Sequence, residues 1–246
     1  MNFDIMTIFP EMLRPYFDES IIGRAKNAGY ISIGLHNIRD YSTDKHRRTD
    51  DTPYGGGYGM VMTPQPIIDC HKEIVKDKTN AHTIYMSPSG KKLTQSKAKK
   101  LLKYDNIVIL CGHYEGVDQR VLDLIVDEEM SVGDYVLTGG ELPAAILVDC
   151  VSRLIPGVLP DALCHEDESI ESGLLEYPQY TRPREFMGLS VPDVLLNGNH
   201  AHILKWREEK SIEKTFNVRR DLLRRKKLSK DMQEYVCKLK ENKEKE

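Results

Sequence analysis

Three stretches of the chain pair an apolar run with a loop of glycine and small polar residues, and these loops are the first candidates for chemistry. They are residues 83–90 (TIYMSPSG), 107–116 (IVILCGHYEG) and 130–140 (MSVGDYVLTGG). Parallel strands of an α/β sheet end at one edge, where glycine lets a ligand approach backbone donors and acceptors. Together the three loops predict a pocket for a nucleotide-like ligand, although any one of them alone could be a tight turn of such a sheet.

Two common phosphate-binding motifs are missing. No Gly-x-Gly-x-x-Gly opens a helix after a strand, and no Gly-x-x-x-x-Gly-Lys-Ser/Thr occurs. This argues against a dinucleotide and against a nucleoside triphosphate in a Walker loop. We interpret His113 as a hydrogen-bonded structural residue of a turn, because no other histidine stands at metal-ligand spacing, and the sequence predicts no metal site.

Strand and helix patterns alternate around these loops. This alternation predicts an α/β fold with a mainly parallel sheet and helices on both faces. A polar loop of unusual length, residues 37–60, interrupts it, and such loops are usually functional or disordered. The expected strands are 3–9, 30–35, 83–87 and 106–111, and the expected helices are 16–28, 65–78, 94–103, 117–126 and 141–154.

The character of the chain changes after Pro160. Residues 161–173 are acidic and poor in bulky apolar side chains, which predicts a flexible linker. Residues 174–192 are loop-like with three prolines, and 199–240 follow a helical pattern in which Trp206 is expected to pack in the core. We therefore expect an α/β domain over 1–160, a linker over 161–173 and a small helical domain over 174–246.

Composition places the chain among ordinary globular proteins, since 40% of its 246 residues are hydrophobic and 30% are charged. Its five cysteines, at 70, 111, 150, 164 and 237, form no Cys-x-x-Cys pair and indicate a reducing compartment. No run approaches the roughly 18 apolar residues of a membrane span, and no basic segment precedes an apolar one at the N-terminus. These features predict a cytoplasmic protein without a membrane partner.

The net charge of −3 hides an asymmetry. Residues 202–246 carry fifteen lysines and arginines against nine acids, so the rest of the chain carries −9. A basic tail after an acidic body suits a polyanion gripped by one part of the molecule. A solvated helical tail is the alternative, because lysine and glutamate are interspersed after Asp231; the cluster 219–227 is the part that favours binding.

Five motifs stand in order along nearly the whole chain. They are DTPYGGGYGM at 51–60, GHYEGVDQR at 112–120, SVGDYVLTGGE at 131–141, RLIPGV at 153–158 and YTRP at 180–183. The chain resembles the TrmD family, the bacterial tRNA (guanine-N1)-methyltransferases of the SPOUT class. The resemblance implies S-adenosylmethionine as methyl donor, methylation of the guanosine just 3′ of the anticodon (position 37), and a deep trefoil knot in the cofactor-binding half.

The resemblance also implies which residues hold S-adenosylmethionine. The family's usual Pro-Gln-Gly is Pro-Ser-Gly here, so position 89 departs from the pattern, and a carboxylate at Glu115 would favour the cationic sulfonium or hold a backbone amide. The implied cofactor-binding residues are Tyr85, Met86, Ser87, Pro88, Gly90, Gly112, Tyr114, Glu115, Gly116, Ser131, Val132, Gly133, Asp134, Tyr135, Val136, Leu137, Gly139, Gly140 and Pro143.

Methyl transfer to guanine N1 needs a base that removes the N1 proton and a donor that stabilises the charge moving onto O6. In the family a linker aspartate is the base and an arginine is the donor. The arginine matches Arg153. The aspartate matches Glu168, a departure that keeps the carboxylate and adds one methylene, with Asp167 as the alternative.

Family resemblance further implies a homodimer in which one subunit's linker and helical domain complete the other's active site. Mg²⁺, which the resemblance also suggests, would act through the RNA or at the catalytic carboxylate, since no dedicated ligand cluster is visible. We expect a loop that approaches the RNA or the neighbouring pocket to form from Asp50, Asp51 and residues 54–59. The expected phosphate contacts of the tRNA are His46, Arg47, Arg48, Arg182, Arg184, Arg219, Arg220, Arg224 and Arg225.

Two other functions remain open from the sequence. Because the catalytic position is substituted, the chain could be an RNA-binding protein that kept the pocket and lost the base. It could also be a related ribose 2′-O-methyltransferase. Loss of transfer on replacing Glu168, and the identity of the methylated atom, would separate these possibilities.

Overall fold

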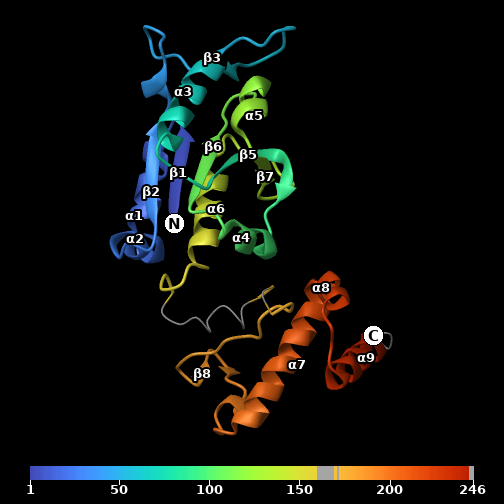
Figure 1. Cartoon of the computed structure of the whole chain (residues 1–246). Coiled ribbons are helices and arrows are strands. Elements are labelled where there is room, and N and C mark those ends of the chain that lie inside the picture. The colour runs from blue at the N-terminus through green and yellow to red at the C-terminus, as the bar shows by residue number, and fades with distance from the viewer. Residues whose placement is uncertain (160–168, 171, 244–246) are drawn as a thin grey trace. The chain divides into compact units, whose positions relative to one another are not determined.

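The structure, a computed structural model, describes residues 1–159, 169–170 and 172–243 (Figure 1). The chain divides into two compact units, residues 1–161 and 162–246. Among the described residues no helix is long and apolar enough to cross a membrane.

The first unit is built on a five-stranded sheet in the order β2-β1-β6-β5-β7, and all four pairings are parallel. The predicted α/β fold with a mainly parallel sheet is confirmed. The strands are β1 (Asn2–Thr7), β2 (Ser32–Asn37), β5 (Ala81–Lys92), β6 (Asn106–Cys111) and β7 (Glu128–Ser131).

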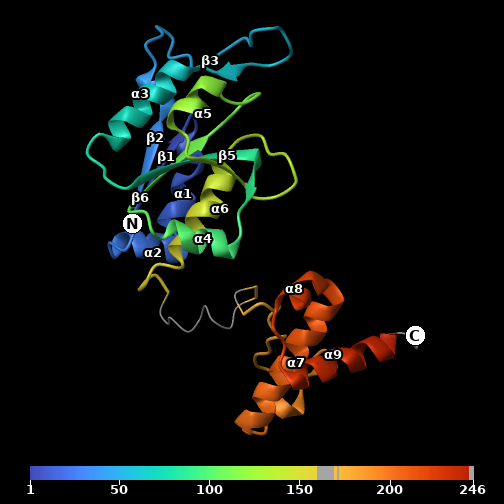
Figure 2. The ribbon, with the colours of Figure 1, turned by 45° about the vertical axis from the view of Figure 1, so that its right-hand side comes forward.

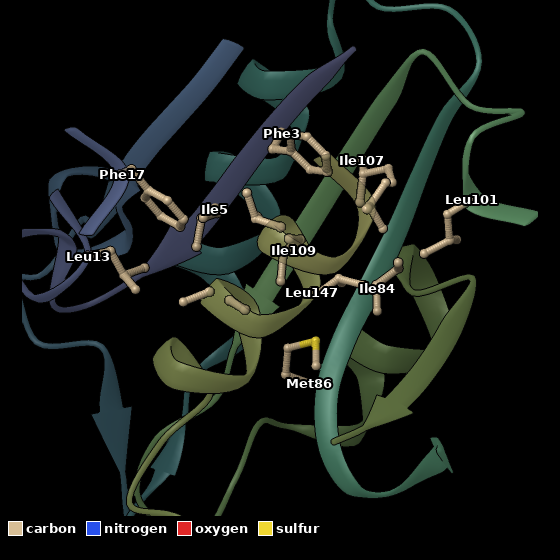
Figure 3. Packing of buried hydrophobic residues seen from close by; sticks show 14 of the residues in the cluster. Phe3, Ile5, Leu13, Phe17, Ile84, Met86, Leu101, Ile107, Ile109 and Leu147 are labelled. Atoms are coloured by element: carbon tan, nitrogen blue, oxygen red, sulfur yellow. The ribbon is translucent and has the colours of Figure 1, made fainter. Parts of the chain in front are cut away.

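Helices cover both faces of this sheet (Figure 2). Alternate strand residues point to opposite sides, so Ile107 and Ile109 pack in one core cluster while Val108 and Leu110 pack in the other. Figure 3 shows the first cluster, where Leu147 meets the strands. This face carries α1 (Arg14–Asp18), α2 (Ser20–Asn27), α4 (Gln95–Leu101) and α6 (Glu141–Ser152), and the other carries α3 (Pro64–Val75) and α5 (Gln119–Ile125).

Side-chain caps explain where two of these helices begin. The Thr94 hydroxyl accepts a hydrogen bond from the Lys97 amide at the start of α4. The Asp118 carboxylate accepts one from the Arg120 amide at the start of α5. Each cap satisfies a backbone donor that the helix itself leaves unpaired.

The single helix expected over 16–28 is wrong. The chain forms α1 and α2 with a break at Glu19, whose backbone is extended, and Ser20 has a φ of 55°. A short 3-10 helix, η1 (Pro10–Met12), precedes them. The apolar period runs through the break, because Phe17, Ile22 and Ala25 are all buried in one core, so the pattern alone did not reveal it.

The polar loop expected over 37–60 contains more structure than predicted. It begins with the 3-10 helix η2 (Ile38–Tyr41), and β3 (Asp50–Asp51) pairs antiparallel with β4 (Val61–Met62). Asp44 organises the turn between η2 and β3 by accepting hydrogen bonds from the amides of His46 and Arg48. The loop is therefore an ordered arm rather than an unstructured insertion.

The second unit carries helices as predicted, but in three pieces. They are α7 (His200–Val218), α8 (Arg220–Arg225) and α9 (Lys230–Lys243), with a non-helical backbone at Arg219. The helical pattern expected over 199–240 is thus divided by two breaks, at Arg219 and between residues 226 and 229. Within the loop-like segment a hairpin forms from β8 (Glu185–Phe186) and β9 (Leu189–Ser190), followed by the 3-10 helix η4 (Asp193–Leu195).

Candidate functional site

A cavity of about 490 Å³ lies where residues 85–89 of β5 meet the loops after β6 and β7. Strand β5, expected to end at residue 87, continues to Lys92, and its pairing with β7 shifts register between Met86 and Lys91. These strands are parallel neighbours, so their carboxyl ends share one edge of the sheet. All three glycine loops singled out from the sequence contribute to its wall. Residues lining the cavity include two carboxylates, Glu115 and Glu129, and among the described residues no lysine or arginine lines it.

Two glycines allow these loops to pack closely. A Cβ on Gly112 would lie 2.7 Å from the Tyr85 hydroxyl oxygen, and one on Gly140 would lie 2.7 Å from the backbone Cα of Cys111. The Gly140 amide also donates a 2.9 Å hydrogen bond to the Gly112 carbonyl. The third loop therefore rests directly on the end of β6.

The ordered arm reaches the rim of the cavity. Met60 accepts a hydrogen bond from the Glu115 amide at 3.0 Å, and the Met62 amide donates to the Gly116 carbonyl at 2.9 Å. Gly59 has a φ of 82°, and a Cβ there would lie 2.5 Å from a Glu115 carboxylate oxygen. Tyr58, next to it, is 97% exposed. The arm is thus fixed to the pocket rim at one end and presents an aromatic side chain to solvent.

Most of the residues expected around the cofactor line this cavity, and two do not. Gly90 packs instead against the backbone of Glu129 and Met130 in β7. Asp134 is turned outward, where its carboxylate pairs with Lys92. The expected residues that line the cavity are Tyr85, Met86, Ser87, Pro88, Gly112, Tyr114, Glu115, Gly116, Ser131, Val132, Gly133, Tyr135, Val136, Leu137, Gly139, Gly140 and Pro143.

Sequence reasoning missed several lining residues. Val117, Gln119 and Leu122 follow the second glycine loop into α5 and could have been anticipated from their position after Gly116. Glu129 carried no such signal, because it precedes the apolar start of the third segment. Four further lining residues lie within the three predicted stretches but were not named individually as cofactor-binding; they are Ser89, His113, Met130 and Thr138.

The hydrogen-bonded interpretation of the His113 ring is wrong for one nitrogen. Its Nε2 is buried and makes no hydrogen bond with any described residue. The ring instead packs edge-on against Phe9, with centroids 4.8 Å apart. No group of three or more potential metal ligands occurs among the described residues.

Of the residues expected to catalyse the reaction, only Arg153 belongs to the described part of the chain, and it does not line this cavity. Arg153 follows the last turn of α6, whereas Pro143 in the first turn lines the cavity, and ten residues of helix span about 15 Å. Asp167 and Glu168 lie outside the described residues.

Comparison with known proteins decides the family. The family model described as "tRNA (Guanine-1)-methyltransferase TrmD" matches residues 1–225. The chain belongs to the TrmD family. It is 55% identical over 223 residues to the tRNA (guanine-N(1)-)-methyltransferase of Ruminiclostridium cellulolyticum, covering 90% of this chain and 96% of the relative. Identity is 55% over 227 residues with the Clostridioides difficile protein (92% and 98% covered) and 52% over 247 residues with that of Alkaliphilus metalliredigens (99% and 100%).

Two arginines of the ordered arm, Arg47 and Arg48, are expected to contact tRNA phosphates. In the structure each of them is paired with an aspartate. Arg48 makes a two-pronged contact with Asp44, at 3.2 and 2.9 Å, and lowers the pKa of that carboxyl well below its usual range. Arg47 lies 3.2 Å from Asp40. Both guanidiniums remain largely exposed, so they keep surface for a further partner.

In the helical unit of this TrmD-family chain, the expected tRNA contacts divide into held and open arginines. Arg219 binds Asp221 through two nitrogens at 2.8 Å, and this contact lowers the pKa of Asp221 to about 2. Arg220 donates to the Phe216 carbonyl and stacks over its ring. Arg184 pairs with Asp193, whereas Arg182, Arg224 and Arg225 are exposed. Trp206, expected in the core, is only half-buried and lies beside Tyr180.

The segment just after the predicted base is fastened to the helical unit. The Leu175 amide donates a 2.8 Å hydrogen bond to the Thr215 hydroxyl, which itself donates to the Ser211 carbonyl. Lys226 Nζ donates to the Ser172 carbonyl at 2.6 Å, and Leu174 is buried. We call residues 172–176, with these contacts, the anchor segment.

Proposed function

We propose that this protein transfers a methyl group from S-adenosylmethionine to N1 of the guanosine immediately 3′ of the anticodon, position 37, in tRNA. The observation that carries the proposal is the cavity at the glycine loops, in a chain that belongs to the TrmD family. A sulfonium is cationic, and a wall with Glu115 and Glu129 but no lysine or arginine among its described residues suits a cation. The bare backbone of the loops suits the edge of an adenine.

In this proposal the two chemical roles fall to a carboxylate of the linker and to an arginine. Glu168 takes the N1 proton, with Asp167 as the alternative, and Arg153 stabilises the negative charge on O6. The nucleophilic nitrogen then attacks the methyl carbon, and S-adenosylhomocysteine leaves. Tyr85 and the three loops hold the donor, while the basic residues of the helical unit hold tRNA phosphates.

The position of Arg153 supports a homodimer that shares its active sites. About 15 Å of helix separates this residue from the cavity wall of the same chain. On α6, Leu142 and Ile146 are 59% and 44% exposed, although they belong to a largely apolar helix. We propose that this face meets a second copy, and that one subunit's linker and helical domain complete the other's pocket.

Three finer expectations from the family belong to the same proposal. Membership of the family implies a trefoil knot formed by the loops of the cofactor half, which tracing the chain in an experimental electron density would test. Mg²⁺ would act through the RNA or at the catalytic carboxylate, so chelation should lower the rate without weakening donor binding. The reaction is placed in the cytoplasm, as the sequence predicts.

Transfer of a labelled methyl group from S-adenosylmethionine to unmodified tRNA tests the function. We expect label in tRNA with guanosine at position 37 and none in a variant with another base there. Digestion of the product should yield 1-methylguanosine; a ribose 2′-O-methyl product would overturn the proposal.

The assignment of the base is tested by two substitutions. Glu168→Gln should abolish transfer while donor binding stays, and Asp167→Asn should lower it little. The reverse order of effects would move the base to Asp167. A wild-type protein that binds donor and tRNA but transfers nothing would be a binding protein.

A further inference from the structure

Glu141 is a buried carboxylate that lies behind the cavity without lining it. It is the first residue of α6 and only 2% exposed. A buried carboxylate is costly unless it is paired or hydrogen-bonded. Its location at a helix N-terminus offsets part of that cost through the backbone dipoles. The contacts of the carboxylate oxygens must offset the rest of that cost.

One carboxylate oxygen of Glu141 is held by the end of β1. The Thr7 hydroxyl donates a 2.6 Å hydrogen bond to Oε1, and Thr7 is fully buried. The same hydroxyl accepts from the Phe9 amide at 2.9 Å, so its orientation is fixed. Thr7 and Glu141 are 134 positions apart in the chain.

The other carboxylate oxygen faces the second glycine loop. His113 Nε2 lies 3.7 Å from Oε2, in contact with it but too far for a hydrogen bond. This is the buried nitrogen that has no hydrogen-bond partner among the described residues. The Phe9 ring closes the other side of the imidazole.

Gly139 lies over this pair and belongs to the third glycine loop. A Cβ there would collide with Glu141 Oε2 and would lie 2.9 Å from His113 Nε2. The backbones of His113 and Gly139 also pair as an isolated antiparallel bridge. Both His113 and Gly139 line the cavity, so their contact joins the second and third glycine loops.

We infer that Glu141 is a positioning residue of the cofactor pocket, held by Thr7 and holding the second and third glycine loops together through His113 and Gly139. The carboxylate touches no part of the cavity, so it acts through the loops and not on the ligand. This inference rests on the proposed function only for the identity of the ligand.

Thr7→Val and Glu141→Gln test the inference, because each keeps the shape of the side chain. The dissociation constant and KM for S-adenosylmethionine should rise about tenfold in each, the factor expected for one buried hydrogen bond, while KM for tRNA stays within twofold. Thr7→Ser, which keeps the hydroxyl, should restore wild-type values. The matched control is Thr83→Val, which removes another buried threonine hydroxyl, bonded to His71 at 2.9 Å.

Amide hydrogen exchange supplies a readout that needs no ligand. In Thr7→Val and Glu141→Gln, peptides covering 112–116 and 131–140 should exchange faster than in wild type and in Thr83→Val. Equal effects of Thr7→Val and Thr83→Val on donor binding, or unchanged exchange in both loops, would overturn the inference. Faster exchange in a protein whose wild type binds no S-adenosylmethionine would uphold the role of Glu141 and refute the proposed function instead.

Discussion

The Tyr16 hydroxyl donates a 2.5 Å hydrogen bond to Asp149 Oδ2 and so ties α1 to the exposed side of α6. Burial and the neighbouring carboxylate raise the pKa of Tyr16 to about 12, so the hydroxyl keeps its proton throughout the physiological range. Asp149 follows Leu142 and Ile146 at helical spacing, and the three share one side of α6. Two exposed aliphatic side chains beside an oriented polar pair are typical of an interface core with a polar rim.

Ile146→Glu should therefore convert a dimer into monomers. A charge at this position would be buried without a partner if two copies met there, which costs several kcal/mol. Sedimentation velocity at micromolar concentration measures the change. Leu124→Glu is the control, because Leu124 is 72% exposed on α5, away from this helix. The interface is misplaced if both variants sediment as the wild type does.

Asp4 contributes a pH-dependent part of the stability of the sheet. It is 6% exposed on β1, and it accepts a 2.8 Å hydrogen bond from His36 and another from Lys78. Burial raises the pKa of Asp4, but these two bonds outweigh it and hold the pKa below its ordinary value of 3.8. The stabilisation is thus complete above pH 3.8 and is lost as the pH falls through the lower value in the folded state.

Asp4→Asn should reduce the free energy of unfolding by about 2 kcal/mol at pH 7 and by less below pH 3. Urea denaturation at both pH values measures it. Asp105→Asn, at the exposed end of the same sheet, is the control and should change stability little at either pH. An equal loss for Asp4→Asn at both values would show that the side chain acts through packing and not through its charge.

Local sequence patterns predicted the elements well where burial is uniform. All six residues of β6 are buried, and its predicted bounds are those observed. The break at Ser20 could not be predicted, because the apolar period continues through it and the turn depends on tertiary packing. The ordered arm was also missed, since the pairing of β3 with β4 involves two residues each and has almost no pattern.

The candidate site was predictable to the extent that it follows from strand ends. The three glycine stretches belong to neighbouring parallel strands, so they had to meet, and all three line the cavity. The first of them is an irregular part of β5 rather than a loop after it. Contacts made across the sequence were not predictable. The docking of Gly59 on Glu115 and the bond between Thr7 and Glu141 join segments that no periodicity relates.

Arg224 should contribute to tRNA affinity through charge alone, since it is exposed on α8. Arg224→Ala should weaken tRNA binding and reduce the slope of log K against log salt concentration by about 0.7 to 0.9, the value for one phosphate contact. Filter binding at salt concentrations from about 50 to about 200 mM measures this slope. Lys72→Ala, an exposed cation on α3, is the control. Identical slopes for both variants would remove Arg224 from the RNA surface.

The anchor segment offers a test of how the helical unit serves the reaction. Thr215→Val removes the acceptor of the Leu175 amide bond and leaves that part-buried donor without this partner. We expect a loss of about 1 to 3 kcal/mol in the stability of the helical unit. Amide exchange of the peptide 172–177 should also become faster, because Leu175 loses its protection.

The proposed base precedes the anchor segment by only a few residues in the chain, so methyl transfer should also slow in Thr215→Val. We expect kcat to fall about tenfold or more, because displacement of a reacting group by a fraction of an ångström has effects of that size, while the KM for S-adenosylmethionine is unchanged. Thr215→Ser keeps the hydroxyl and should behave as wild type. A normal kcat in Thr215→Val, despite faster exchange at Leu175, would mean that the anchor segment stabilises the helical unit without placing the carboxylate.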